Sequence, residues 1–237
     1  MMNEINKPFL DHLDELRNRI IKSFLSIILF AIIGYFLSDE IIDLLISPIN
    51  NNSISFQVLK ITSIFLIKIG IGVLFGLFIS MPFILYQFLK FIMPAFENEL
   101  NIYKLILYLS FYLLFLIIGL FFGYFILIPA SISFFASLSI NLPLIELNYT
   151  LDNYLIYLIW ILIISSFIFQ LPFIVILLIK FGLVDRETLR QYRKHVIVVF
   201  FILAALFTPP DPISQIFVVI PLYCLFEFSI FISRFIK

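Results

Sequence analysis

The sequence has few of the residues on which soluble enzymes and disulfide-bonded domains depend. Only one of its 237 residues is cysteine, Cys224, which excludes a disulfide framework and any metal site built from several thiolates. Charged residues make up 13% of the chain, against about 25% in an average soluble domain. No GxxxxGK[ST] loop occurs, and the two histidines, His12 and His195, do not form a metal-ligand pattern. We therefore expect neither an enzyme nor a bound cofactor or metal.

What the sequence has in abundance is apolar side chains. Hydrophobic residues account for 63% of the chain, 31 of them are phenylalanine, and the mean hydropathy is +1.16. A water-soluble fold of this size cannot bury so much apolar surface, so part of the surroundings must be lipid. We expect an all-α membrane protein in which residues 1–237 form a single integral membrane domain.

Charged residues separate the apolar stretches and thereby indicate the membrane spans. A helix needs about 20 residues to cross about 30 Å of hydrocarbon. We predict a six-helix bundle whose last two spans are short, and we expect Pro129 to end the third span. An alternative is a four-span chain with a re-entrant C-terminal hairpin. The six predicted spans are approximately residues 23–45, 65–90, 104–128, 153–179, 195–208 and 213–232.

The positions of the basic residues predict the orientation. Six spans place both termini on the same side, and that side then carries all of the 15 lysines and arginines except Lys60 and Lys68. The loops on the opposite side are acidic or neutral. Because basic residues favour the cytoplasmic side, both termini are predicted to be cytoplasmic.

The N-terminal segment and the small residues suggest how the helices are arranged. Residues 1–22 have apolar and polar faces at helical spacing, which indicates an amphipathic helix at the cytoplasmic membrane surface. The pairs Gly72/Gly76 and Gly119/Gly123 are spaced for close helix packing in lipid. Prolines within or at the ends of spans bend helices and favour a bundle with a concave face. These prolines are Pro82, Pro129, Pro172 and Pro221.

Polar side chains at membrane depth are costly and therefore informative. Gln170 lies in the middle of a predicted span, and Gln215 begins the last one. Either a hydrogen bond between helices or a functional contact explains Gln170 equally well. Glu227 lies near the inner end of the last span, where we expect it to pair with Arg234.

Several segments, in order along nearly the whole chain, resemble the TatC family, the large membrane subunit of the twin-arginine protein translocase. The resemblance rests on segments spread from the N-terminus to the last span, which makes it far more specific than any one motif. The matching segments are His12-Leu13-x-Glu15-Leu16-Arg17-x-Arg19, Pro82-Phe83-x-x-Tyr86-Gln87-x-x-x-Phe91-Ile92-x-Pro94, Phe169-Gln170-x-Pro172, Thr208-Pro209-Pro210-Asp211-x-x-Ser214-Gln215 and Pro221-Leu222-Tyr223-Cys224-Leu225-Phe226-Glu227.

The resemblance implies a receptor that binds signal peptides with paired arginines and moves folded proteins by using the proton-motive force. It also implies TatA- and TatB-like single-span partners, self-association in a receptor complex and no nucleic acid. The membrane would be the bacterial cytoplasmic membrane, or a thylakoid or other organellar inner membrane. Rival interpretations are a small secondary transporter or channel and a purely structural scaffold. A transporter would be expected to show an internal repeat and carboxylates in its central spans. The sequence has neither, which argues against the transporter.

The resemblance also implies two groups of site residues. The signal-peptide group is Glu15, Arg17, Phe91, Pro94, Glu97 and Glu99. The group for partner contacts within the membrane is Gln170, Pro172, Thr208, Asp211, Gln215 and Glu227. The chain departs from the family pattern in two places. The loop glutamate usual six residues after the proline is replaced by Leu100, which makes Glu99 the preferred equivalent, and Gln170 stands where many relatives have glutamate.

Overall fold

The computed structural model describes residues 7–47, 56–92, 102–140, 149–207 and 212–234, most of which are helical. The chain divides into two compact units. The first unit contains residues 1–44 and 60–110, and the second contains residues 45–59 and 111–237. Each unit is described by itself.

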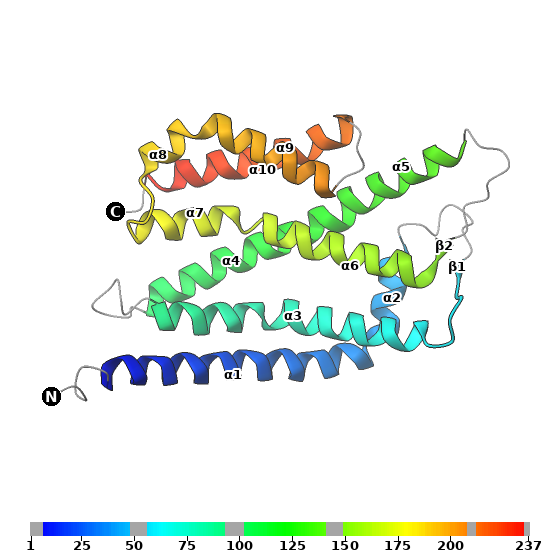
Figure 1. The fold of residues 1–237 in the computed structure, drawn as a ribbon, viewed down its shortest axis with the longest axis horizontal. Helices are drawn as coiled ribbons and strands as arrows, with labels where there is room; N and C mark the ends of the chain where they lie inside the picture. Colours follow the sequence, from blue (N-terminus) through cyan, green and yellow to red (C-terminus); the bar gives the residue numbers. More distant parts are fainter. Residues whose placement is uncertain (1–6, 48–55, 93–101, 141–148, 208–211, 235–237) are drawn as a thin grey trace. The chain divides into compact units, whose positions relative to one another are not determined.

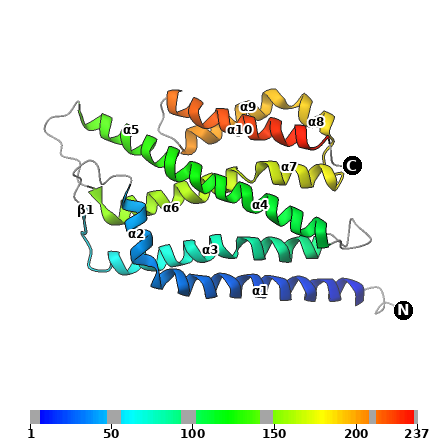
Figure 2. The same cartoon turned by 180° about the vertical axis from the view of Figure 1, so that it is seen from behind.

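The first unit is built on two long helices, α1 (Lys7–Phe36) and α3 (Ser63–Ile92), which lie side by side along much of their length (Figure 1, Figure 2). α1 continues without a break past residue 22, so the expected surface helix and the first span form one helix. No proline or glycine occurs between residues 9 and 33, and therefore nothing in the sequence interrupts the backbone hydrogen bonds.

Glycines allow α1 and α3 to approach closely. A Cβ atom on Gly76 would lie 2.6 Å from both the Ala31 nitrogen and the Ile27 carbonyl oxygen, and one on Gly72 would lie 2.8 Å from the Ala31 oxygen. By contrast, a Cβ on Gly70 would meet nothing within 4 Å. The packing role predicted for Gly72 and Gly76 is thus confirmed, because their missing side chains let the two backbones touch.

A short helix, α2 (Ser38–Ile46), follows α1 and is tied to α3 by an ion pair. The Lys68 ammonium lies 2.7 Å from the Asp39 carboxylate. This pair joins the first turn of α2 to the N-terminal part of α3, so the unit is held together at that end by charge as well as by packing.

The second unit includes most of a long helical stretch composed of α4 (Ile102–Phe122), a π-helical segment η3 (Gly123–Leu127) and α5 (Ile128–Ile140). The expectation that Pro129 ends this span is wrong. Pro129 is the second residue of α5 and comes two residues after the π-helical segment, and the helical stretch continues through it. The wider π-helical turn before it takes up the change in hydrogen bonding.

Two further helices, α6 (Leu151–Ile168) and α7 (Leu171–Lys180), pack within this unit. A Cβ on Gly119 would lie 2.9 Å from the Phe169 Cβ and 3.0 Å from the Ser165 carbonyl oxygen. This glycine therefore allows α4 to approach the junction of α6 and α7. Before α6, strand β2 (Tyr149–Thr150) pairs in parallel with β1 (Phe56–Gln57).

The C-terminal part of the second unit contains α8 (Arg186–Gln191), α9 (Arg193–Phe207) and α10 (Pro212–Ile232). α9 and α10 lie next to each other in both views (Figure 1, Figure 2), and α10 also packs on α7. The apolar residues Leu222, Phe226 and Ile230 of α10 are buried.

Four helical stretches among the described residues are long and apolar enough to cross a membrane. The 15 residues of α9 span only about 22 Å at 1.5 Å per residue, which is shorter than the hydrocarbon core. Large apolar side chains on these stretches remain exposed, as expected for surfaces that face lipid. The four stretches are Asp11–Phe36, Ser63–Ile92, Ile102–Phe134 and Leu151–Lys180.

Candidate functional site

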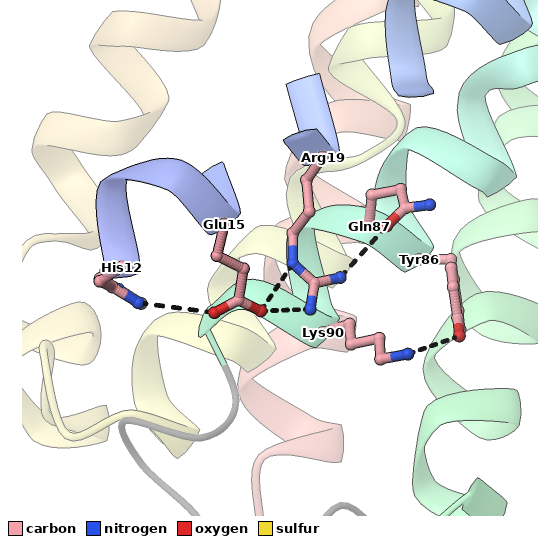
Figure 3. Close-up of polar contacts among 6 residues, drawn as sticks. All are labelled: His12, Glu15, Arg19, Tyr86, Gln87 and Lys90. Carbon is pink, nitrogen blue, oxygen red and sulfur yellow. Dashed lines mark hydrogen bonds and ion pairs between the residues drawn. The ribbon is translucent and has the colours of Figure 1, made fainter. Parts of the chain in front are cut away.

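A network of polar side chains links the N-terminal half of α1 to the C-terminal half of α3 (Figure 3). The Glu15 carboxylate accepts hydrogen bonds from Arg19, with a distance of 3.0 Å between Nε and Oε1 and a second bond from Nη2 to the same oxygen. The remaining guanidinium nitrogen, Nη1, donates to Gln87 Oε1 at 3.1 Å. On the other side, His12 Nδ1 lies 3.7 Å from Glu15 Oε2.

This network borders an open cavity of about 590 Å³ between the two helices. Three carboxylates and three basic side chains line it, together with Asn18, Tyr86 and Gln87. Glu15 is 43% exposed, so its carboxylate is accessible to a ligand from solution. The charged lining residues are Asp11, Asp14, Glu15, Arg19, Lys22 and Lys90.

A smaller cavity of about 170 Å³ adjoins the first and shares Arg19 and Gln87 with it. Apolar side chains, including Ile20 and Phe91, dominate its lining. Phe91 also stacks on His12, with ring centroids 4.3 Å apart and planes 14° apart. The structure thus places a charged region, lined by both acidic and basic side chains, next to an apolar region.

The other predicted signal-peptide residues have different positions. Arg17 is exposed, lies 3.3 Å from the Asp14 carboxylate and does not border either cavity. Pro94, Glu97 and Glu99 lie outside the described residues, so the structure brings together only Glu15 and Phe91 from this group.

The sequence interpretation gave no role to Arg19 or Gln87, although both belong to segments that carry the resemblance. Arg19 follows Glu15 by four residues, which is the spacing at which oppositely charged side chains meet on a helix, so this contact has a sequence signal. Gln87 is 68 positions from Arg19 and has no such signal.

Within the second unit, Gln170 lies at the junction of α6 and α7 and is 4% exposed. Its Nε2 donates a long hydrogen bond of 3.5 Å to the Tyr112 carbonyl of α4, whereas its buried Oε1 has no hydrogen-bond partner among the described residues. Pro172 is buried in the first turn of α7. The contact of Gln170 is therefore one between helices, and its amide oxygen has no hydrogen-bond partner among the described residues.

Glu227 on α10 is bound to α9 rather than to the end of its own helix. Its carboxylate accepts a hydrogen bond of 2.7 Å from Arg193 and one of 2.9 Å from the Tyr223 hydroxyl. The expected pairing with Arg234 is wrong, because residues seven apart on a helix are about 10 Å apart along its axis. Instead, the Arg234 guanidinium lies over the Phe231 ring.

The remaining partner-contact residues form no described cluster. Gln215 is half-exposed near the start of α10, and Thr208 and Asp211 lie outside the described residues. Within the described ranges, no three histidine, cysteine or carboxylate side chains are placed to share a metal ion.

Comparison with known proteins identifies the family. The family described as "Sec-independent protein translocase protein (TatC)" matches residues 11–221, which include both the Glu15 network and Gln170. The chain belongs to the TatC family. Members of this family are components of a protein translocase, and the apolar helices agree with a membrane location.

Relatives and solved structures agree with this assignment. The chain is 33% identical to a TatC of Halalkalibacterium halodurans, over 98% of this chain and 91% of that one. It is 30% identical to a TatC of Halothiobacillus neapolitanus, over 96% of this chain but only 62% of that longer protein. A crystal structure titled as the twin-arginine translocase receptor TatC, in the detergent DDM, superimposes with a TM-score of 0.81 at 30% identity. That match covers 94% of this chain and 99% of the other.

Proposed function

We propose that this chain is the receptor and core subunit of a twin-arginine translocase. It binds the paired arginines of signal peptides on the cytoplasmic side and works with TatA- and TatB-like subunits to move folded proteins across the membrane. The proton-motive force drives this movement. The use of that force, self-association of the receptor and a bacterial cytoplasmic or organellar inner membrane are inferred from membership of the TatC family.

The observation that carries the proposal is the position of Glu15. Its carboxylate is 43% exposed beside a cavity of about 590 Å³, which has room for the ends of two arginine side chains. Guanidinium groups bind carboxylates through two parallel hydrogen bonds, and such charge-assisted bonds are about twice as strong as neutral ones. An apolar cavity that includes Phe91 adjoins this site and suits the uncharged part of a signal peptide.

A single exposed ion pair contributes only about 0.2–1 kcal/mol and cannot select a sequence. We propose that Glu99, in the loop after α3, supplies a second carboxylate, with Glu97 as the alternative. Pro94 precedes both glutamates in the sequence, and Arg17 is proposed to lie on the same side of the membrane. Two carboxylates near each other then distinguish a pair of arginines from one.

Peptide binding by the purified full-length chain tests this function. We expect Glu15→Gln and Glu99→Gln each to weaken binding of a labelled twin-arginine peptide, and the effect to shrink at high salt because screening weakens exposed charges. Glu97→Gln is the control for the loop assignment. If Glu97→Gln weakens binding and Glu99→Gln does not, Glu97 is the second carboxylate. If Glu15→Gln leaves binding unchanged, the receptor site is overturned. Export of a twin-arginine reporter in a deletion strain complements the binding assay.

We further propose six spans with both termini in the cytoplasm, arranged with a concave face, in which α9 and α10 form the short final pair. Cysteine labelling tests the topology in a background where the exposed Cys224 is replaced by serine. Cysteines at positions 50 and 148 should react from the trans side, and those at positions 6 and 188 from the cytoplasmic side. Trans labelling at 188 would exclude the six-span arrangement.

The partner subunits are proposed to contact the intramembrane polar positions, which include Gln170, Gln215, Thr208 and Asp211. Side-chain amides form hydrogen bonds between helices in lipid that contribute about 0.6–2 kcal/mol each. We expect Gln215→Leu to reduce crosslinking to TatA- or TatB-like helices while leaving signal-peptide binding intact. Unchanged crosslinking would remove Gln215 from the partner interface.

A further inference from the structure

The Glu15 carboxylate is already bound by a guanidinium of its own helix. Arg19 directs two of its three nitrogens, Nε and Nη2, to Glu15 Oε1, while Nη1 donates to Gln87 Oε1 at 3.1 Å (Figure 3). The Arg19 side chain is only 16% exposed, in contrast to 43% for Glu15. This internal guanidinium is therefore held by both α1 and α3, and it occupies one side of the accessible carboxylate.

An incoming arginine needs the atoms that Arg19 occupies. A two-bond contact between guanidinium and carboxylate uses both carboxylate oxygens. Glu15 Oε1 receives both Arg19 bonds, whereas the contact of Oε2 among the described residues is with His12 Nδ1, at 3.7 Å. A ligand can reach Oε2 directly, but it completes a two-bond contact only if Arg19 gives up Oε1.

We propose that Arg19 is a specificity-determining residue that competes with the signal peptide for Glu15. This inference rests on the proposed function and concerns how the same site distinguishes arginine from lysine. An arginine of the peptide replaces Arg19 with an equivalent planar fork, so the exchange costs little. A lysine ammonium is a single point of charge without that fork and cannot make an equivalent exchange.

Gln87 gives the displaced side chain a place to remain. Its Oε1 already accepts a hydrogen bond from Arg19 Nη1, and Gln87 is only 8% exposed on α3. Arg19 can therefore release Glu15 while it stays hydrogen-bonded at the boundary of the two cavities. The guanidinium then does not have to enter the apolar cavity without a partner, which would be costly.

A positioning role for Arg19 predicts the opposite result. If Arg19 only held the Glu15 side chain in place, its removal would weaken the binding of every cationic peptide. Competition instead predicts that removal strengthens binding, and that lysine peptides gain more than arginine peptides. The sign of the change therefore separates the two roles.

The test measures dissociation constants of two labelled peptides, identical except for an Arg-Arg or a Lys-Lys pair, by fluorescence anisotropy on the full-length chain in detergent. We expect Arg19→Gln to tighten Lys-Lys binding at least about fivefold and Arg-Arg binding about twofold, as for loss of one competing ion pair. The ratio of the Lys-Lys dissociation constant to the Arg-Arg dissociation constant then falls. Arg19→Lys keeps the charge but removes the fork, and it should also lower this ratio.

Two controls separate competition from a general change in charge. Lys90 borders the same cavity, and its Nζ lies 3.5 Å from the Tyr86 hydroxyl. Lys90→Gln should tighten both peptides by the same factor and leave the ratio unchanged. Arg190→Gln removes an arginine that is paired with Glu187 at 3.4 Å on α8, and it should change neither constant.

Weaker Arg-Arg binding by Arg19→Gln, with recovery in Arg19→Lys, would overturn the competition and make Arg19 a positioning residue. The competition would also be overturned if Lys90→Gln lowered the ratio as much as Arg19→Gln does. In a Glu15→Gln background the effect of Arg19→Gln should vanish, because coupled residues do not act additively. If Glu15→Gln alone leaves Arg-Arg binding unchanged, the proposed receptor site fails, which is a separate outcome from failure of the Arg19 proposal.

Discussion

The imidazole of His12 on α1 stacks on the ring of Phe91 on α3, with 4.3 Å between the ring centroids. The Nδ1 atom of His12 also lies 3.7 Å from Glu15 Oε2. The stack therefore connects the apolar cavity to the carboxylate, and it fixes the N-terminal part of α1 against α3.

Replacing Phe91 by leucine should lower both the stability of this end of the unit and the affinity for a twin-arginine peptide. Aromatic pairs contribute about 0.5–1.5 kcal/mol beyond the area that they bury, and leucine keeps most of the apolar volume. Thermal unfolding in detergent and peptide titration measure the two effects. Phe65→Leu is the matched control on the same helix, since Phe65 is 57% exposed and should tolerate the change. Equal losses in both variants would show that the stack contributes nothing specific.

Adding one methyl group at Gly76 should destabilise the first unit. The Cβ of Gly76→Ala would lie 2.6 Å from backbone atoms of Ala31 and Ile27, so α1 and α3 must move apart. Overpacking of this kind costs about 1–3 kcal/mol, and the melting temperature should fall. Gly70→Ala adds the same methyl group to the same helix where nothing lies within 4 Å, and it should melt at or above the wild-type temperature. A Gly76→Ala protein as stable as Gly70→Ala would contradict the close packing.

The contact between Arg193 and Glu227 should stabilise the pairing of α9 with α10. The hydrogen bond is 2.7 Å long, but both side chains are partly exposed, which limits the contribution to about 0.2–1 kcal/mol. A double-mutant cycle of Arg193→Gln and Glu227→Gln, followed by thermal unfolding, should give a coupling of this size. The same cycle with Arg234→Gln should give none. Coupling to Arg234 instead would favour the pairing expected from the sequence.

These residues show which features a single sequence reveals. The long apolar helices and the glycine pair that packs α3 on α1 follow from local composition and spacing, because lipid and helix geometry impose them directly. The contact of Glu15 with Arg19 has the four-residue spacing of a helical ion pair. The partners of Glu227 and Arg19 on other helices, at separations of 34 and 68 residues, depend on tertiary packing that no local pattern records.

Continuity of the helices was harder to predict for the same reason. A proline is read as a break when its surroundings are unknown, yet Pro129 lies in the first turn of α5 after a π-helical segment. No proline or glycine occurs between residues 9 and 33, which indicates one continuous helix. The change from polar to apolar composition near residue 22 instead suggests a separate surface helix, and this second signal is the misleading one. Backbone hydrogen bonds, rather than hydropathy, decide where these helices end.

Gln170 is buried but only partly hydrogen-bonded. Its contact with the Tyr112 carbonyl is 3.5 Å long, and its Oε1 has no hydrogen-bond partner in the described part of the chain. A buried acceptor without a partner costs about 1–3 kcal/mol, so Gln170→Leu should be as stable as the wild type or more stable. If the free oxygen serves a partner helix, the same change should reduce crosslinking to TatA- or TatB-like subunits. Tyr112→Phe keeps the backbone carbonyl that Gln170 contacts and is the matched control, with crosslinking unchanged. A large loss of stability in Gln170→Leu, with crosslinking preserved, would assign this glutamine to the packing of α4 on α7 alone.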